Sequence, residues 1–456
     1  MNIESSIFRE YDIRGTYPEQ INESSIKSIA FAIAKRCKKD NISTLVVGRD
    51  GRMSGPALLE AFCEGLIESG INVDNIGLVT SPLLYFAAKK SASKSGIMIT
   101  GSHNPKNYNG IKMVINDSPI SGTEIYTLIN HEKNTNLEKG EVQYSDIKPI
   151  YLEEVCNNIS INNPEKIKVV LDCGNGAAGC IAPDLFKKLG LDVIELYSEV
   201  DGDFPNHHPD PGKLENLHDL INEVKDNNAD IGFAFDGDGD RVGLVTNNGD
   251  SVFPDKLMML FSKDILSKDK GSIVFDVKCS NQLENIIREN GGDPIMSPTG
   301  HFHIKKSIKK HNSLLGGEMS GHIFFNDKWY GFDDGIYAAA RLLEILSEFK
   351  DPSKILKDLP KSFSTPELNI KLKEGEQHTI ISKLQETAEF PEAIDIIKID
   401  GLRIEYTDGF GLMRASNTTP VIVLRFEAES KEKLKSIQDE FKLKLIEYIP
   451  PENIPF

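Results

Sequence analysis

"KIKVVLDCGNGAAG", residues 166–179, contains the pattern from which most of this chain is built. A short apolar run ends in a polar loop with two glycines, and apolar residues at helical spacing follow at Ile181, Leu185 and Leu189. An apolar run of strand length that leads into a helical pattern is typical of a βα unit. The segment therefore predicts a buried strand with a helix that covers its sheet.

The same pattern occurs twice more in the chain. "STLVVGRDGR" (43–52) precedes a helical pattern that includes Leu58 and Leu66, and "GSIVFDVKCS" (271–280) precedes one that includes Leu283 and Ile287. Further apolar runs of strand length lie at 192–197, 231–235 and 293–296. Strands that alternate with helices predict parallel or mixed sheets. Three copies of the unit predict three related α/β domains in series.

The last hundred residues follow another pattern. Strands are predicted at 367–372, 396–406 and 420–430, with a hairpin turn at Asp400-Gly401, and helices at about 376–388 and 430–447. This part is expected to be an α+β domain. Boundaries near Pro149, Asn248-Gly249 and Pro360 give four domains, at 1–148, 149–249, 250–360 and 361–456.

Composition limits the class of partner. The 456 residues are 39% hydrophobic and 27% charged, which is typical of a soluble globular protein. No apolar run approaches the ~18 residues that span a membrane, and the N-terminus lacks the features of a signal peptide. The six cysteines form no CxxC pair, so they are expected to be reduced thiols in the cytoplasm. A net charge of −17 disfavours nucleic acid and anionic membranes as partners, and a small anionic substrate would need a local group of cations.

"DIGFAFDGDGDRVGLV" (230–245) gives the sharpest chemical signal. Asp236, Asp238 and Asp240 alternate with glycines at the end of an apolar run. Alternate residues of an extended chain share one face, so the carboxylates are expected to converge, and three hard oxygen ligands suit Mg²⁺. An EF-hand calcium loop is excluded, because arginine and asparagine stand at its sixth and twelfth positions. An acidic surface turn is the competing interpretation, but three such carboxylates repel one another without a counter-ion.

Two further segments combine polar side chains between apolar runs. "LLGGEMSGHIFF" (314–325) places Glu318, Ser320 and His322 at alternate positions. "GFGLMRASNTTPVIVL" (409–424) contains a predicted polar loop just before a strand. It carries Arg414, Ser416, Asn417, Thr418 and Thr419. An arginine with hydroxyls and free backbone amides can bind a phosphate, whereas either segment alone could be an ordinary surface turn.

Isolated cations and a serine loop complete the candidates. Tyr11 and Arg14, Lys278, and His301 each lie next to a predicted strand or glycine turn, while His207, His208 and His303 show no transition-metal spacing. In "GIMITGSHNPKNYNGIKM" (96–113), the apolar run Ile97–Ile99 ends in a polar loop with Ser102 and His103, and Lys112 follows. Because neighbouring side chains are expected to diverge, Ser102 and His103 are not predicted to form a nucleophile–base pair.

Taken together and in this order, "TGSHNP", "DGDGDR", "GEMSGH" and "RASNTTP" resemble the motifs of the α-D-phosphohexomutase superfamily. The forms of the first and third motifs are most similar to the bacterial phosphomannomutase/phosphoglucomutase branch. The resemblance covers nearly the whole chain, from Phe8 to the C-terminal domain. It implies three related α/β domains and a fourth, TBP-like α+β domain, arranged as a heart-shaped molecule with the active site in a central cleft.

The resemblance also implies an activity: the interconversion of hexose 1-phosphate and hexose 6-phosphate, for mannose, glucose or both. Ser102 would carry the phosphoryl group, and its oxygen would complete the shell of a Mg²⁺ ion held by Asp236, Asp238 and Asp240. A hexose 1,6-bisphosphate would be the intermediate and activator. The partners would be small sugar phosphates, and the protein is expected to be a monomer.

Roles for the remaining candidates follow from the same resemblance. Lys112, His301 and Arg14 are the candidates for proton transfer, and the sequence does not rank Lys112 against His301. His103 and Arg241 would support the loop from Asp236 to Asp240, which we call the metal loop. The residues implied to bind substrate are Tyr11, Lys278, His301, Glu318, Ser320, His322, Arg414, Ser416, Asn417 and Thr418. Two alternatives stay open at this point: a phosphatase or transferase with Asp236 as nucleophile, and a sugar-phosphate binding protein without activity.

Overall fold

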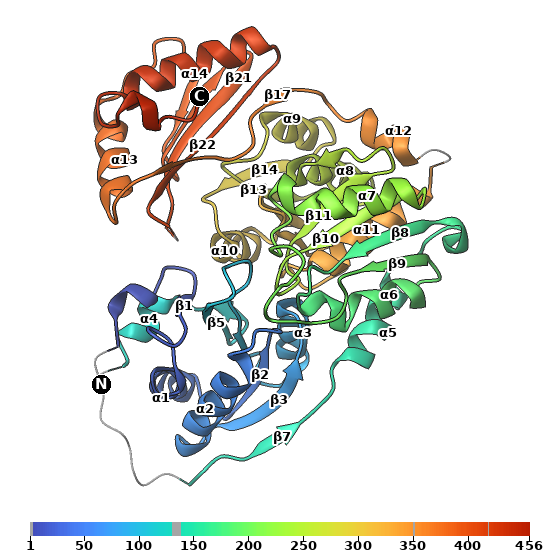
Figure 1. Ribbon diagram of the computed structural model, residues 1–456, viewed down its shortest axis with the longest axis vertical. Coiled ribbons are helices and arrows are strands. Elements are labelled where there is room, and N and C mark those ends of the chain that lie inside the picture. Colours follow the sequence, from blue (N-terminus) through green and yellow to red (C-terminus); the bar gives the residue numbers. More distant parts are fainter. Residues whose placement is uncertain (1–2, 130–137, 350–351, 418) are drawn as a thin grey trace.

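The computed structural model describes residues 3–129, 138–349, 352–417 and 419–456, with the side chains of 352 and 353 left out. Its strands form four separate sheets, and we call the parts of the chain that carry them domains I to IV. Figure 1 shows domain I (blue) and domain IV (red) at opposite ends, with domains II and III between them. None of the helices in the described ranges combines the length and apolar character that crossing a bilayer requires.

The first three sheets share one plan. In each, a central strand is parallel to the strand on either side, and an antiparallel strand extends one side of this parallel core. The central strands are β2 (Thr44–Arg49), β8 (Lys168–Asp172) and β13 (Ser272–Asp276). These are the three strands predicted from the repeated βα pattern, so the prediction of three related α/β domains with mixed sheets is confirmed.

The helix after each central strand is also where the sequence placed it. The elements are α2 (Gly55–Glu68), α6 (Ala182–Lys188) and α9 (Asn281–Glu289), each followed by a parallel strand, β3 (Asn72–Leu78), β9 (Asp192–Leu196) or β14 (Asp293–Ser297). The side chain of Ser280 accepts a hydrogen bond from the Gln282 amide and so caps the N-terminus of α9.

The remaining elements of domains I to III surround these units. In domain I they are β1 (Ile13–Thr16), α1 (Glu23–Lys39), α3 (Ser81–Lys90), β4 (Gly96–Ile99), β5 (Tyr108–Ile115), β6 (Ser118–Pro119), α4 (Gly122–Tyr126) and β7 (Val142–Tyr144). In domain II they are α5 (Lys148–Asn158), α7 (His218–Asp226), β10 (Ile231–Phe235), β11 (Val242–Thr246) and β12 (Ser251–Val252). In domain III they are α8 (Pro254–Lys268), α10 (His301–His311), β15 (Leu315–Gly317), β16 (Ile323–Phe325), α11 (Gly335–Ser347) and α12 (Pro352–Lys357).

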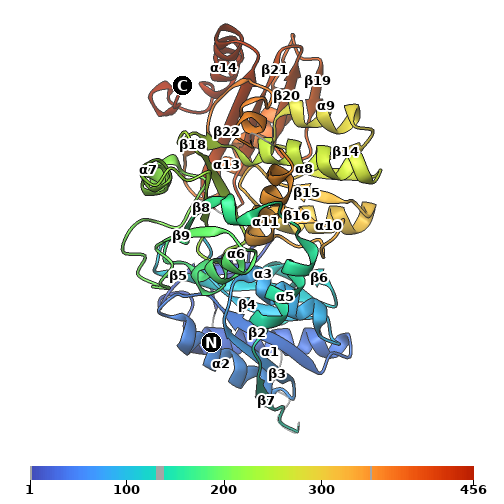
Figure 2. The ribbon, with the colours of Figure 1, turned by 90° about the vertical axis from the view of Figure 1, so that its right-hand side faces the viewer.

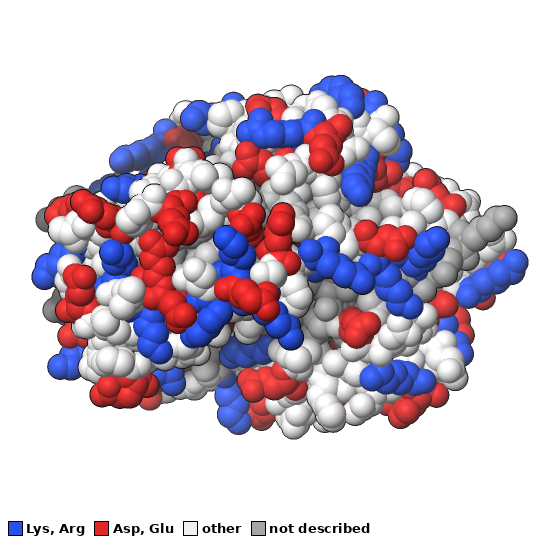
Figure 3. Space-filling model, turned by 90° about the horizontal axis from the view of Figure 1, so that it is seen from above, with Lys and Arg blue, Asp and Glu red and all other residues white. Residues whose placement is uncertain are grey.

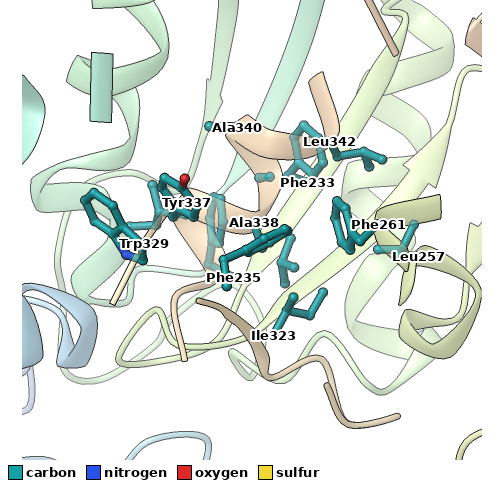
Figure 4. Close-up of a cluster of buried hydrophobic side chains, with 14 of the residues drawn as sticks. Phe233, Phe235, Leu257, Phe261, Ile323, Trp329, Tyr337, Ala338, Ala340 and Leu342 are labelled. Atoms are coloured by element: carbon teal, nitrogen blue, oxygen red, sulfur yellow. The ribbon is translucent and has the colours of Figure 1, made fainter. Parts of the chain in front are cut away.

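The hydrophobic core of domain III continues into domain II. Helix α11 is buried at every residue except the last, so it has no solvent-facing side. Figure 4 shows Tyr337, Ala338, Ala340 and Leu342 of α11 beside Phe233 and Phe235 of β10 and Phe261 of α8. Domains II and III therefore share one core, which fixes their sheets relative to each other.

Domain IV is an antiparallel sheet with two helices, seen at the top of the turned view in Figure 2. Its elements are β17 (Phe363–Ser364), β18 (Leu368–Lys371), α13 (Glu376–Thr387), β19 (Asp395–Ile397), β20 (Leu402–Tyr406), β21 (Gly409–Ala415), β22 (Val421–Ala428) and α14 (Lys431–Leu445). The predicted hairpin at Asp400-Gly401 is confirmed, since β19 pairs with β20. The prediction that Arg414 lies in a loop was wrong, because 409–415 is the buried strand β21.

Candidate active site

Three loops in equivalent positions build the centre of the candidate site. In each of the first three sheets, the loop leaves a parallel strand and enters its antiparallel neighbour: β4 to β5, β10 to β11, and β15 to β16. These loops contain Ser102, the three aspartates from Asp236 to Asp240, and Glu318 to His322 respectively. Polar groups at the carboxyl ends of parallel strands are typical of binding sites in α/β proteins.

The metal loop brings three buried carboxylates together. Asp236, Asp238 and Asp240 are fully buried, and one oxygen from each lies within 4.8 Å of the others. The convergence was predicted, but the expected extended chain was wrong: the Gly239 amide donates to the Asp236 carbonyl, and Gly239 has a φ of +77°. One oxygen of Asp238 has no hydrogen-bond partner among the described residues. Oxygen ligands in this arrangement fit a hard divalent cation.

Lys112 reaches into the metal loop from β5. Its Nζ lies 2.7 Å from Asp238 Oδ2 and 2.5 Å from Asp240 Oδ2. Burial alone would lower the pKa of this ammonium group, but the two aspartates outweigh it and raise the pKa well above its ordinary value. Lys112 is therefore held as a cation in this arrangement and supplies positive charge beside the carboxylates.

Ser102 points at the metal loop. Its Oγ lies 3.1 Å from Asp236 Oδ2 and 3.1 Å from His103 Nδ1. The expectation that the neighbouring side chains diverge was wrong, because Ser102 adopts a left-handed backbone conformation with a φ of +49°. Burial and the nearby charges of Arg241 and Arg14 lower the pKa of His103 well below its ordinary value, so this imidazole is neutral.

Arg241 links the metal loop to the serine loop. Its guanidinium contacts the His103 ring, and Nε lies 3.6 Å from Asp236 Oδ2. Arg14 lies on β1, where its Nη2 is 2.5 Å from Asp12 Oδ2. These cations and Lys112 form the local positive group that the overall charge of −17 required for an anionic substrate.

The loop from Glu318 to His322 closes the other side of the metal loop. His322 Nδ1 lies 2.8 Å from Glu318 Oε2, and Ser320 Oγ lies 3.0 Å from the same imidazole nitrogen. His322 Nε2 lies 3.3 Å from Asp240 Oδ1. Burial opposes protonation of His322, but Asp240 and Glu318 raise its pKa to about 9. Burial opposes ionisation of Glu318, but His322 and Lys278 lower its pKa to about 2.

His301 and Lys278 border the same space. The imidazole of His301, the first residue of α10, lies with its ring centre 5.8 Å from that of His322. Burial, with Lys305 and Lys112 nearby, lowers the pKa of His301 well below its ordinary value. Lys278 Nζ lies 3.0 Å from Glu367 Oε2, a carboxylate of domain IV.

The predicted phosphate-binding residues lie where domain IV meets domains I and III. Arg414 Nε donates to Asp400 Oδ2 at 2.8 Å, and the same oxygen accepts the Thr299 amide at 2.9 Å. Asn417 Nδ2 donates to the Tyr11 hydroxyl at 2.6 Å, and that hydroxyl donates to the Thr299 carbonyl at 3.1 Å. Ser416 Oγ lies 3.1 Å from Thr419 Oγ1, whereas Thr418 lies outside the described residues.

Sequence reasoning missed several residues that support the site. Asp333 Oδ1 lies 2.6 Å from Lys305 Nζ, and its other oxygen lies 3.8 Å from His301 Nδ1. His208 Nε2 lies 2.5 Å from the carbonyl of His103, which it can reach as a donor. The adjacent titratable residues Asp333-Asp334 and His207-His208 can be seen in the sequence. Nothing in their spacing indicates which loop each pair contacts.

Comparisons with known proteins agree with this geometry. Family profiles described as phosphoglucomutase/phosphomannomutase α/β/α domains I, II and III match residues 5–136, 149–249 and 253–363, and the C-terminal domain profile matches residues 367–444. A phosphomannomutase/phosphoglucomutase of Pseudomonas syringae pv. tomato is 50% identical over 99% of this chain and 97% of its own. A phosphoglucomutase of Neisseria gonorrhoeae is 48% identical over 97% of both chains.

A solved structure shows the same likeness in three dimensions. A phosphoglucomutase/phosphomannomutase family protein from Burkholderia thailandensis is 44% identical, with a TM-score of 0.94 over the whole of both chains. The phosphoprotein pp63/parafusin of Paramecium, at 18% identity and a TM-score of 0.76, shares the fold over 98% of this chain and 95% of its own.

Proposed function

This chain belongs to the phosphoglucomutase/phosphomannomutase family, and from that premise we propose that it interconverts hexose 1-phosphates and hexose 6-phosphates. The observation that carries the proposal is the approach of Ser102 Oγ to Asp236 at 3.1 Å, next to two further buried aspartates. A hydroxyl in that position can hold a phosphoryl group against a metal site. We propose glucose and mannose as the sugars, in line with the names of the relatives.

The resting enzyme carries a phosphoryl group on Ser102. Asp236, Asp238 and Asp240 would hold a Mg²⁺ ion, which would neutralise charge on the transferred phosphoryl group. Lys112 and Arg241 add positive charge on either side of these carboxylates. The loop conformation fixes Ser102 Oγ, so that the phosphorus faces the incoming hydroxyl group of the substrate.

The reaction consists of two transfers in opposite directions. The free hydroxyl of hexose 1-phosphate attacks the phosphorus, the bond from phosphorus to Ser102 Oγ breaks, and hexose 1,6-bisphosphate forms. The bisphosphate then turns over within the site, and its other phosphoryl group returns to Ser102. Hexose 6-phosphate leaves, and the enzyme is restored without net consumption of phosphate.

The proton of the attacking hydroxyl needs an acceptor. We propose that the acceptor is the imidazole of His301, because burial, with Lys305 and Lys112 nearby, lowers its pKa well below the ordinary value and keeps the ring neutral. The His301 ring centre lies 5.8 Å from that of His322, which contacts Asp240 and Glu318.

The phosphate that does not react would bind to domain IV. Arg414, Ser416 and Asn417 provide a guanidinium, a hydroxyl and an amide at the junction with domain I. Thr418 is proposed with them from its place in the motif. Glu318 and Ser320 would bind sugar hydroxyls, with Lys278 and Tyr11 at the border of the site.

All four motifs of the proposed site lie in one chain, so the proposed reaction does not require a second subunit, and we propose a monomer. The six cysteines, all of which lie in the described ranges, are free, and this supports a reducing compartment such as the cytoplasm.

Intact-protein mass spectrometry tests the proposal. The purified protein, incubated with glucose 1,6-bisphosphate and Mg²⁺, should gain about 80 Da at Ser102 and convert glucose 1-phosphate to glucose 6-phosphate. Replacing Ser102 with alanine should abolish both signals and keep the thermal midpoint. Phosphate on Asp236 in an active sample would instead establish an aspartyl phosphate, and absence of Mg²⁺-dependent turnover would establish a binding protein.

A further inference from the structure

Arg52 lies in the turn between β2 and α2, and it is 1% exposed. Its guanidinium donates four hydrogen bonds, and every acceptor is a backbone carbonyl of the loop that contains Ser102 or of the first residue of β5, which follows it. Nη2 donates to Ser102 at 2.7 Å and to Asn104 at 2.6 Å. Nη1 donates to Pro105 at 2.6 Å and to Tyr108 at 2.9 Å. A single side chain thus joins the carbonyls of four residues across the whole loop.

Asp50 fixes the start of the same loop. Its Oδ2 accepts hydrogen bonds from Thr100 Oγ1 at 2.8 Å and from the Gly101 amide at 3.1 Å. The same oxygen lies 3.3 Å from Arg52 Nε, and Oδ1 accepts from the Arg52 amide at 3.0 Å. The two side chains therefore hold each other while they hold the loop.

The loop needs such support because Ser102 has a φ of +49°. A residue with a Cβ seldom adopts this left-handed conformation, and it persists only where the surrounding contacts determine it. The guanidinium also packs closely on the loop: a Cβ added at Gly101 would lie 2.4 Å from both Cζ and Nε of Arg52.

We infer that Arg52 is a positioning residue for phosphoryl transfer, which sets the direction of Ser102 Oγ by binding the carbonyls of its loop. The inference rests on the proposed function and adds to it. Arg52 is buried behind the loop, so it does not reach a substrate. Its loss should therefore reduce kcat and leave KM nearly unchanged, since orientation of the reacting group contributes to the transition state and not to substrate binding.

Lysine cannot replace arginine here. An ammonium group keeps the charge but presents three donors from one point, whereas the planar fork of arginine reaches four carbonyls that lie apart. Arg52→Lys should lower kcat for glucose 1-phosphate about a hundredfold, with KM within about threefold of the parent protein. The rate at which glucose 1,6-bisphosphate phosphorylates Ser102, followed by intact mass, should fall in parallel.

Arg341→Lys is the matched control. Arg341 is equally buried, on α11, and pairs with Asp327 at 2.9 Å and Asp264 at 3.4 Å. The substitution removes the same fork from a buried network that, among the described residues, has no contact with the Ser102 loop, so it should lower the thermal midpoint and leave kcat within twofold.

The outcomes separate the inference from the proposed function. If the parent protein shows neither turnover nor phosphate on Ser102, the proposed function itself is wrong. An active parent with a folded Arg52→Lys variant that retains kcat within twofold, or that loses no more than Arg341→Lys, would overturn the role of Arg52 alone. If Arg52→Lys does not fold, Asp50→Asn replaces it in the test. It should lower kcat at least tenfold at constant KM, and an unchanged kcat overturns the inference.

Discussion

At the scale of single residues, the site is governed by the balance of buried charges. The three carboxylates from Asp236 to Asp240 would repel one another, but the side chains of Lys112 and Arg241 form ion pairs with their oxygens. The outer surface is different: Figure 3 shows acidic and basic side chains interspersed over the face seen from above. The net charge of the chain therefore says little about the field at Ser102, which depends on a few cations that the fold brings together.

Asp334 should make the stability of the protein depend on pH. It accepts hydrogen bonds from the Tyr151 hydroxyl at 2.9 Å and the Tyr337 amide at 2.9 Å, and burial raises its pKa from 3.8 to about 7. Between these values the unfolded chain is ionised while the folded protein keeps the proton, so stability falls as the pH rises from about 4 to 7. The loss amounts to roughly 4 kcal/mol, since one pKa unit is worth about 1.4 kcal/mol.

Asp334→Asn should remove this dependence and retain the acceptor for Tyr337. Thermal midpoints measured at pH 5 and pH 8 should differ less in the variant than in the parent protein. Equal differences in the two proteins would show that Asp334 is ionised across this range.

At the scale of elements, the position of Arg414 depends on β21, a strand that the sequence pattern does not predict. β21 is buried along its whole length between β20 and β22, and Arg414 lies near its end. The sequence "GFGLMRA" contains two glycines and no alternation of polar residues, which is why a loop was predicted there. A central strand buried on both faces gives no period-two signal.

Gly401 should be needed to keep Arg414 in place. It has a φ of +78°, and a Cβ there would lie 2.3 Å from the Met413 carbonyl oxygen and 2.6 Å from Arg414 Cα. Gly401→Ala should push the β19–β20 hairpin away from β21. We expect a loss of about 1–3 kcal/mol of stability and a rise in KM for glucose 1-phosphate larger than the fall in kcat.

Gly375→Ala is the control for this prediction. Gly375 has a φ of +84° in the same domain, but an added Cβ would meet nothing within 4 Å. The substitution should lower the free energy of unfolding by only about 1–2 kcal/mol, the cost of a left-handed backbone for alanine. KM should be unchanged. If both variants leave KM unchanged, the hairpin does not position Arg414.

At the scale of the whole molecule, the sequence predicted the helices and strands better than the contacts between distant segments. The repeated βα units, the hairpin and the converging aspartates were visible because each depends on residues close in sequence. The contacts from His208 to the serine loop and from Arg52 to four carbonyls were not, because they join segments about 50 to 105 residues apart. Local periodicity carries no information on such pairs, and a buried arginine looks like a surface arginine in sequence.

At the junction of domains I, III and IV, one set of hydrogen bonds joins all three domains beside the proposed site. Asn417 of domain IV donates to the hydroxyl of Tyr11 in domain I, and this hydroxyl donates to the Thr299 carbonyl in domain III. We expect this shared hydroxyl to keep domain IV over the site while the proposed bisphosphate turns, and so to limit both its escape and the entry of water.

Asn417→Ala should therefore make the enzyme release its intermediate. We expect KM for glucose 1-phosphate to rise about tenfold, which corresponds to the loss of about one hydrogen bond of ~1.4 kcal/mol. The concentration of glucose 1,6-bisphosphate needed for half-maximal activity should rise with it, because more intermediate escapes in each turnover. Tyr11→Phe removes the other half of the same contact, so the double variant should be no worse than the more impaired single variant. Fully additive losses would mean that the two residues act separately on the substrate, and the contact between domains I and IV would then have no part in retaining the intermediate.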